Sequence, residues 1–122
     1  MLLLSFGLLL TAAMLGGLLA ALHLRGRNAP AGWMPGALHG VCGVAGLIVM
    51  LFALRGPPRG EAMGVASFGR IAALLLVIAP SVGLAIRVLR VRCHPATGLI
   101  IGIHATIAIG GIVILAAYTL VG

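Results

Sequence analysis

Four long apolar stretches, separated by short polar segments, set the pattern of this chain. They run approximately over residues 2–22, 36–54, 67–89 and 96–121. Each is close to the ~20 residues that an α-helix needs to cross a bilayer. Backbone groups in lipid must bond within their own segment, so each stretch is predicted to be a helix. The predicted fold is therefore an all-α membrane protein, a bundle of four transmembrane helices.

The polar segments between the stretches predict how the helices pair. Residues 90–95 form a very short connection, so the third and fourth helices are predicted to be antiparallel neighbours. Residues 55–61 form the only polar stretch of any length, and they separate the first two helices from the last two. The chain is thus predicted to be one transmembrane domain of two tandem helical hairpins, residues 1–57 and 66–122.

An internal repeat with an offset of 65 residues supports this division. His39 and His104 share that offset, and each is followed by small residues. The other matching pairs include Arg25 and Arg90, Arg27 and Arg92, Pro30 and Pro95, and Gly46 and Gly111. The alternative is a chance similarity between two membrane hairpins. The matching pairs include the less common residue types His, Arg and Pro, which favours a repeat. Each hairpin then contributes one imidazole.

Composition excludes several classes of function. The chain is 62% hydrophobic and 7% charged, whereas a soluble domain has about a quarter of its residues charged. Glu61 is its single acidic residue, and its eight basic residues are all arginine. Without aspartate no Ser-His-Asp set is possible, and without lysine no phosphate-binding P-loop is possible. No basic face with interleaved aromatic residues indicates nucleic-acid binding.

The arginines suggest a location and an orientation. With four crossings, the connections near residues 23–35 and 90–95 share one membrane face, and the two termini share the other. The first face holds five arginines and the second holds three. The excess predicts a cytoplasmic location for the first face and a non-cytoplasmic location for the termini. Arginine without lysine is typical of GC-rich bacterial genomes, so we expect a multi-pass protein of the bacterial inner membrane.

The two matched histidines are the candidate functional residues. An ionisable residue inside a membrane span is by default a functional hypothesis. The helices that carry His39 and His104 start on the same face, so they run parallel and a pseudo-two-fold axis lies along the membrane normal. The two imidazoles would then meet at equal depth. Two neutral imidazoles are the axial ligands that a six-coordinate haem iron takes, which predicts haem b held by His39 and His104.

The surroundings of the histidines agree with this prediction. A flat porphyrin fits between helices only where the facing side chains are small, and its propionates need cations, for which arginine is well suited. The predicted small-residue slot consists of Gly40, Gly43, Ala105 and Ala108. The predicted propionate partners, all at the histidine end of the bundle, are Arg25, Arg87 and Arg90.

In layout, with four helices and paired helix histidines, the chain resembles the small membrane b-type cytochromes. The resemblance covers the architecture and His39 and His104 only. It departs from the two-haem pattern, in which histidines lie near both faces. The resemblance implies single-electron transfer through one haem near one face. Any enzymatic role would be that of a haem-dependent membrane oxidoreductase acting on quinol or superoxide. Expected partners are membrane lipids, quinone or a redox protein, and a second copy of the chain.

Other interpretations stay open at this point. The histidines could simply hydrogen-bond between helices, and small residues four apart are mainly helix-packing signals. The chain would then be a non-catalytic scaffold or accessory subunit of a larger complex. His39, Cys42 and His104 could instead form a three-ligand metal site, or the two histidines a proton relay. His23 and His94 are predicted to lie at the headgroups.

Overall fold

A computed structural model of the chain confirms the predicted all-helical architecture. It describes residues 1–25, 33–91 and 97–120, with side chains for all of these except 88–91 and 97. The helices are α1 (Leu2–Leu24), α2 (Trp33–Ala53), α3 (Phe68–Val91) and α4 (Thr97–Leu120), and a 3₁₀ turn, η1 (Glu61–Met63), lies between α2 and α3. Helix α2 begins three residues before the predicted start. Pro35 lies in its first turn, where a missing backbone N–H removes no intrahelical bond.

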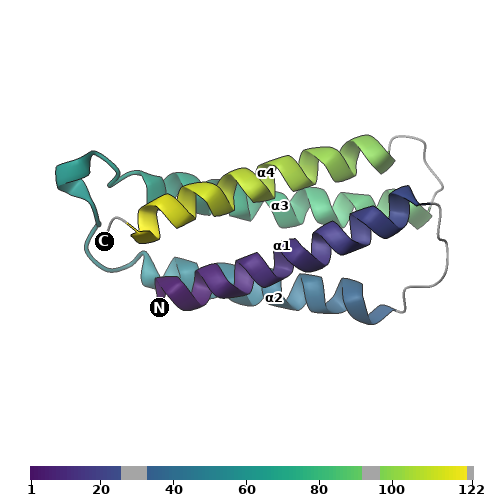
Figure 1. Cartoon of the computed structure of the whole chain (residues 1–122), viewed down its shortest axis with the longest axis horizontal. Helices are drawn as coiled ribbons and strands as arrows, with labels where there is room; N and C mark the ends of the chain where they lie inside the picture. Colours follow the sequence, from purple (N-terminus) through teal and green to yellow (C-terminus); the bar gives the residue numbers. More distant parts are fainter. Residues whose placement is uncertain (26–32, 92–96, 121–122) are drawn as a thin grey trace.

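The four helices form two antiparallel hairpins packed side by side (Figure 1). Helices α1 and α2 make one hairpin, and α3 and α4 make the other. Between the hairpins, α1 contacts α4 and α2 contacts α3, so α2 and α4 lie diagonally across the bundle. The start of α1, the end of α4 and η1 lie at one end, which we call the terminal end; the end of α1, the start of α2, the end of α3 and the start of α4 lie at the opposite end, the loop end (Figure 1).

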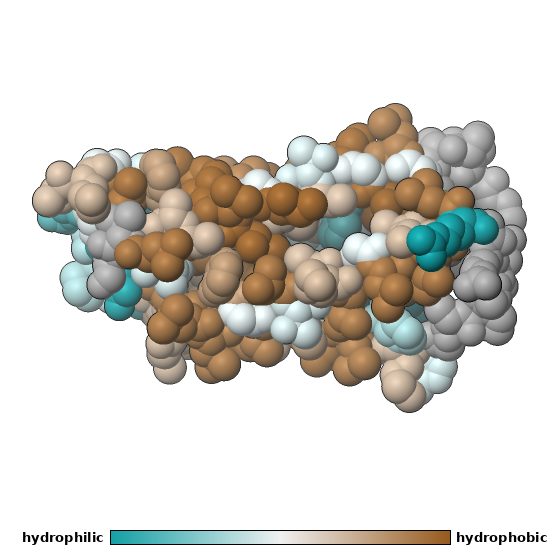
Figure 2. All heavy atoms as spheres, viewed as in Figure 1, coloured by the Kyte–Doolittle hydropathy of each residue, from teal (hydrophilic) through white to brown (hydrophobic). Residues whose placement is uncertain are grey.

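All four helices are long and apolar enough to cross a membrane. The visible surface of the bundle is predominantly apolar along its length, and the most hydrophilic surface lies near its two ends (Figure 2). Many large apolar side chains point outward, including Leu74, Leu84 and Leu99. These features identify the chain as a multi-pass membrane protein.

Glycines bring the helices of each hairpin into close contact. A Cβ on Gly46 would lie 2.8 Å from Leu9 Cγ, and a Cβ on Gly111 would lie 2.7 Å from Leu76 Cγ. Lipid supplies no hydrophobic force between helices, so close approach over small residues is what stabilises such pairs. In the first hairpin, the buried Ser5 hydroxyl adds a hydrogen bond to the Gly46 carbonyl at 2.9 Å.

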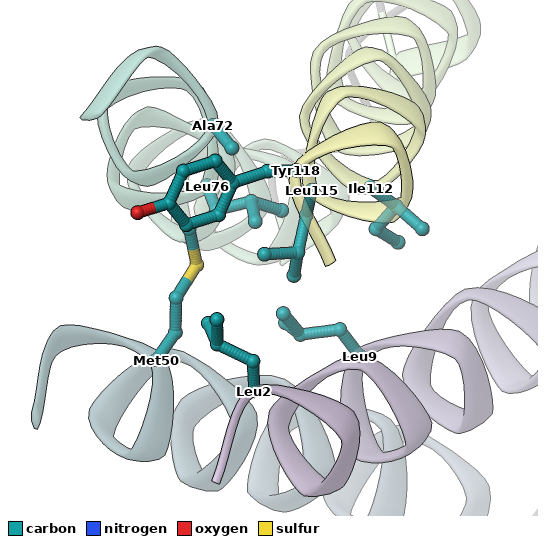
Figure 3. Close-up of a cluster of buried hydrophobic side chains, with 8 residues drawn as sticks. All are labelled: Leu2, Leu9, Met50, Ala72, Leu76, Ile112, Leu115 and Tyr118. Atoms are coloured by element: carbon teal, nitrogen blue, oxygen red, sulfur yellow. The ribbon is translucent and has the colours of Figure 1, made fainter. Parts of the chain in front are cut away.

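The packed core lies toward the terminal end. Figure 3 shows side chains from all four helices converging there. The cluster consists of Leu2, Leu9, Met50, Ala72, Leu76, Ile112, Leu115 and Tyr118. On the loop side, none of the described residues 13–25, 33–45, 80–87 and 98–110 is buried. The fully buried part of the interior therefore lies in the terminal half, and the described side chains of the loop half are half-buried or exposed.

Tyr118 joins this core to the connection between the hairpins. Its ring is buried, and its hydroxyl accepts a hydrogen bond from the Arg59 backbone N–H at 3.2 Å.

We expect Tyr118→Phe to lower the free energy of unfolding by about 1 kcal/mol, because it removes the acceptor while the ring still packs. The measurement is thermal or denaturant unfolding in detergent. Thr106→Val is the control, since its exposed hydroxyl bonds only Gly102 of its own helix; equal stability of both variants and the parent would contradict the prediction.

Candidate functional site

The two matched histidines meet inside the bundle. His39 lies six residues after the first residue of α2, and His104 lies seven residues after the first residue of α4. At 1.5 Å per residue, both are about 10 Å from the loop end of their helices. Their ring centroids are 6.0 Å apart, and the ring planes are inclined at 76°. Residues 65 positions apart in the sequence thus come together from diagonally opposed helices.

Each imidazole is anchored to the other helix of its own hairpin. The Nδ1–H of His39 donates to the Ala12 carbonyl of α1 at 2.8 Å. The Nδ1–H of His104 donates to the Ala79 carbonyl of α3, also at 2.8 Å. A carbonyl oxygen can only accept, so Nδ1 carries the proton in both rings. In a neutral imidazole this leaves the lone pair on Nε2.

The Nε2 atoms are open to an incoming group. No described residue is hydrogen-bonded to either Nε2. Among the described residues, no buried side-chain nitrogen or oxygen lacks a partner, so both Nε2 atoms reach accessible surface. Both rings are half-buried and lie where the fully buried core gives way to half-buried and exposed side chains. On the face drawn in Figure 2, a recess with hydrophilic surface lies between α1 and α4.

Two glycines make room for the rings. A Cβ on Gly16 would lie 2.9 Å from Cε1 of His39, and a Cβ on Gly83 would lie 3.2 Å from Cε1 of His104. Each glycine comes four residues after the alanine whose carbonyl accepts the Nδ1 proton. We call each pair an imidazole seat: Ala12 and Gly16 in α1, and Ala79 and Gly83 in α3.

The imidazole seats were not among the predicted site residues, although the sequence carries a signal for them. The two seats are 67 positions apart, as are the preceding pairs Leu8–Leu9 and Leu75–Leu76. The histidines are 65 positions apart. Because the first helices of the hairpins align at a different offset from the second helices, a comparison at a single offset does not reveal the matching glycines.

The residues predicted to form a small-residue slot have varied surroundings. A Cβ on Gly40 would meet nothing within 4 Å, and one on Gly43 would lie 3.8 Å from the Ala12 Cβ. Gly40 faces outward, beside an apolar groove that it shares with other α2 residues. Ala105 and Ala108 are half-buried on α4. The glycines that border the rings are instead Gly16 and Gly83.

The predicted propionate partners lie at the loop end. Arg25 caps α1, and Arg87 is exposed near the last turn of α3. The side chain of Arg90 lies outside the described residues, as do Arg27, Arg92 and His94. His23 lies in the last turn of α1. The described charges at this end are thus basic, and Glu61 lies at the terminal end, in η1.

A metal site with three protein ligands is not formed by the described residues. Cys42 is free and half-buried one turn after His39, yet no three His, Cys, Asp or Glu side chains gather in the described part of the chain. Protein-bound zinc takes at least three protein ligands. Haem iron takes four nitrogens from its porphyrin and needs only two from the protein. The residues present therefore fit haem better than a bare metal ion.

Comparison with protein families, curated proteins and solved structures finds no match.

Proposed function

We propose that the chain is a membrane b-type cytochrome that carries single electrons through one haem, with His39 and His104 as the axial ligands. The observation that carries the proposal is the pair of imidazoles with centroids 6.0 Å apart, each with Nδ1 bonded to a carbonyl. Ligand histidines almost always donate their second ring N–H in this way, because the bond fixes the tautomer and the orientation of the ring.

The separation of the rings suits one metal atom between them. An imidazole nitrogen binds a transition metal at about 2 Å. Two rings that bind one atom from opposite sides therefore have centroids roughly 6 Å apart. At this level the fully buried core gives way to half-buried and exposed side chains.

The arrangement favours electron transfer over chemistry on a bound small molecule. A bound haem supplies an iron that takes up and releases one electron. If His39 and His104 both held the iron of a bound haem, no coordination position would be left for oxygen or another substrate. The depth of the histidines, about 10 Å from the loop end, favours exchange with quinol, superoxide or a redox protein on that side. We assign this side to the cytoplasm of a bacterial inner membrane, since its arginines follow the positive-inside rule.

The absorption spectrum tests the proposal. The protein is expressed with ample haem supply, purified in detergent, and measured oxidised and then reduced with dithionite. We expect a red preparation whose Soret band shifts and sharpens on reduction, with the sharp visible bands of a six-coordinate low-spin haem. A colourless preparation would overturn the proposal. Equal uptake of haem by a control membrane protein in the same detergent would also overturn it.

A scaffold or accessory subunit is the second candidate, and exposed glycines favour it. A Cβ on Gly36, Gly40, Gly98 or Gly102 would meet nothing within 4 Å. Small residues four apart on a lipid-facing surface allow another helix to approach closely. Under this alternative the purified protein is colourless, and Gly40→Leu disrupts its association with a second copy or another subunit, as measured by crosslinking in membranes.

A further inference from the structure

The imidazole seats hold the two rings at a large angle to each other. The ring planes of His39 and His104 are inclined at 76°. Each ring is constrained at two points: Nδ1 is bonded to a carbonyl at 2.8 Å, and Cε1 lies against a glycine. Rotation of a ring about its Nε2 bonding direction would carry Nδ1 away from that carbonyl. The seats therefore fix the angle between the planes as well as the positions of the rings.

Close contact at the glycines limits the space in which each ring can move. A Cβ on Gly16 would lie 2.9, 3.2 and 3.8 Å from Cε1, Nδ1 and Nε2 of His39, so the ring edge lies directly against the α1 backbone. The corresponding distances at Gly83 are 3.2, 3.4 and 3.9 Å. The two seats agree within a few tenths of an ångström, although their sequences differ elsewhere. Each ring is thus held by a hydrogen bond and a glycine contact within its own hairpin.

We infer that Gly16 and Gly83 are positioning residues that hold the axial imidazoles with crossed planes. This inference depends on the proposed function, because the angle has an electronic consequence only when both rings bind one iron. Gly16 and Gly83 would touch neither substrate nor metal. The angle between the imidazole planes that they set can be measured separately from haem binding.

Crossed planes have a specific spectroscopic consequence. An axial imidazole donates π electron density into the metal d orbital that lies perpendicular to its ring plane. Parallel rings act on the same d orbital and separate the energies of the metal d orbitals. The result is a rhombic electron paramagnetic resonance (EPR) spectrum with three resolved features. Nearly perpendicular rings act on different orbitals and leave the levels close in energy. The ferric protein is then expected to give a highly anisotropic low-spin spectrum dominated by a single low-field feature.

EPR of the haem-loaded ferric protein tests the inference. The parent is expected to show the highly anisotropic low-spin signal. Gly16→Ala is expected to displace the His39 ring, which converts that signal to a rhombic low-spin or a high-spin one. The matched control is Gly17→Ala in the same helix, since a Cβ on Gly17 would meet nothing within 4 Å; this control is expected to keep the parent signal.

The outcomes separate the two proposals. If the parent shows no six-coordinate optical spectrum, the proposed function fails. If the parent is six-coordinate but its EPR spectrum is rhombic, the crossed-plane inference fails while the proposed function stands. Gly83→Ala gives a second test, because its milder contact of 3.2 Å allows the fold to adjust. An unchanged EPR signal in folded, haem-loaded Gly16→Ala and Gly83→Ala would overturn the assignment of these glycines as positioning residues.

Discussion

Alanine in place of either His39 or His104 is expected to abolish the six-coordinate haem spectrum of the purified protein. Each imidazole provides one of two axial ligands, and no other His, Cys, Asp or Glu of the described chain gathers with them to replace it. The single variants should therefore give a five-coordinate high-spin spectrum with a broadened Soret band, and the double variant should lose haem altogether. The measurement is the absorption spectrum of each variant, with haem content by the pyridine haemochromogen assay.

Two controls distinguish loss of a ligand from loss of the fold. Exogenous imidazole should restore the six-coordinate spectrum of His39→Ala, because the vacated space accepts a free ring. His23→Ala removes another histidine toward the loop end and is expected to keep the parent spectrum. A six-coordinate spectrum in His39→Ala without added imidazole, or its loss in His23→Ala, would contradict the assignment of the ligands.

Gly46→Ala is expected to destabilise the first hairpin. The new Cβ would lie 2.8 Å from Leu9 Cγ and 3.1 Å from the Leu9 backbone nitrogen, and backbone cannot move aside as a side chain can. Overpacking of this kind costs about 1–3 kcal/mol. The helix propensity of alanine returns about 1 kcal/mol. Separation of α1 from α2 would also weaken the bond from Ser5 to the Gly46 carbonyl. We therefore expect a clearly lower unfolding midpoint in detergent.

Gly43→Ala and Gly111→Ala are the comparison variants for Gly46→Ala. A Cβ on Gly43 would make an ordinary contact of 3.8 Å with the Ala12 Cβ, so this variant should match or exceed the parent in stability. The three atoms nearest to a Cβ on Gly111 would be side-chain atoms of Leu75 and Leu76, none of them backbone, so its effect should be smaller than that of Gly46→Ala. A Gly46→Ala variant as stable as Gly43→Ala would show that α1 and α2 are not in close contact at this level.

The fold could be predicted from hydropathy because lipid imposes a strict rule. A stretch of about 20 apolar residues in a bilayer has few alternatives to a helix. The very short connection between α3 and α4 likewise leaves an antiparallel pair as the natural arrangement. Helix ends were less predictable: α2 begins at Trp33, because Pro35 is compatible with a first helical turn and does not exclude one.

The site could be predicted only in part, because a repeat identifies candidate residues without showing their contacts. The shared offset of His39 and His104 predicted that the rings meet. It could not show that Ala12 and Ala79 accept the Nδ1 protons, since these acceptors are backbone carbonyls, which every residue carries. The role of Gly16 and Gly83 was equally hidden, because a glycine that seats a ring looks in sequence like any other small residue in a membrane helix.

Titration of the haem-free protein with haemin shows whether His39 and His104, one from each hairpin, bind a single iron. We expect a six-coordinate low-spin Soret band that grows linearly and reaches its end point at one haem per chain. We expect no such band in the His39→Ala, His104→Ala double variant. No saturable band in the parent, or the same band in the double variant, would contradict binding of a single iron by these two histidines.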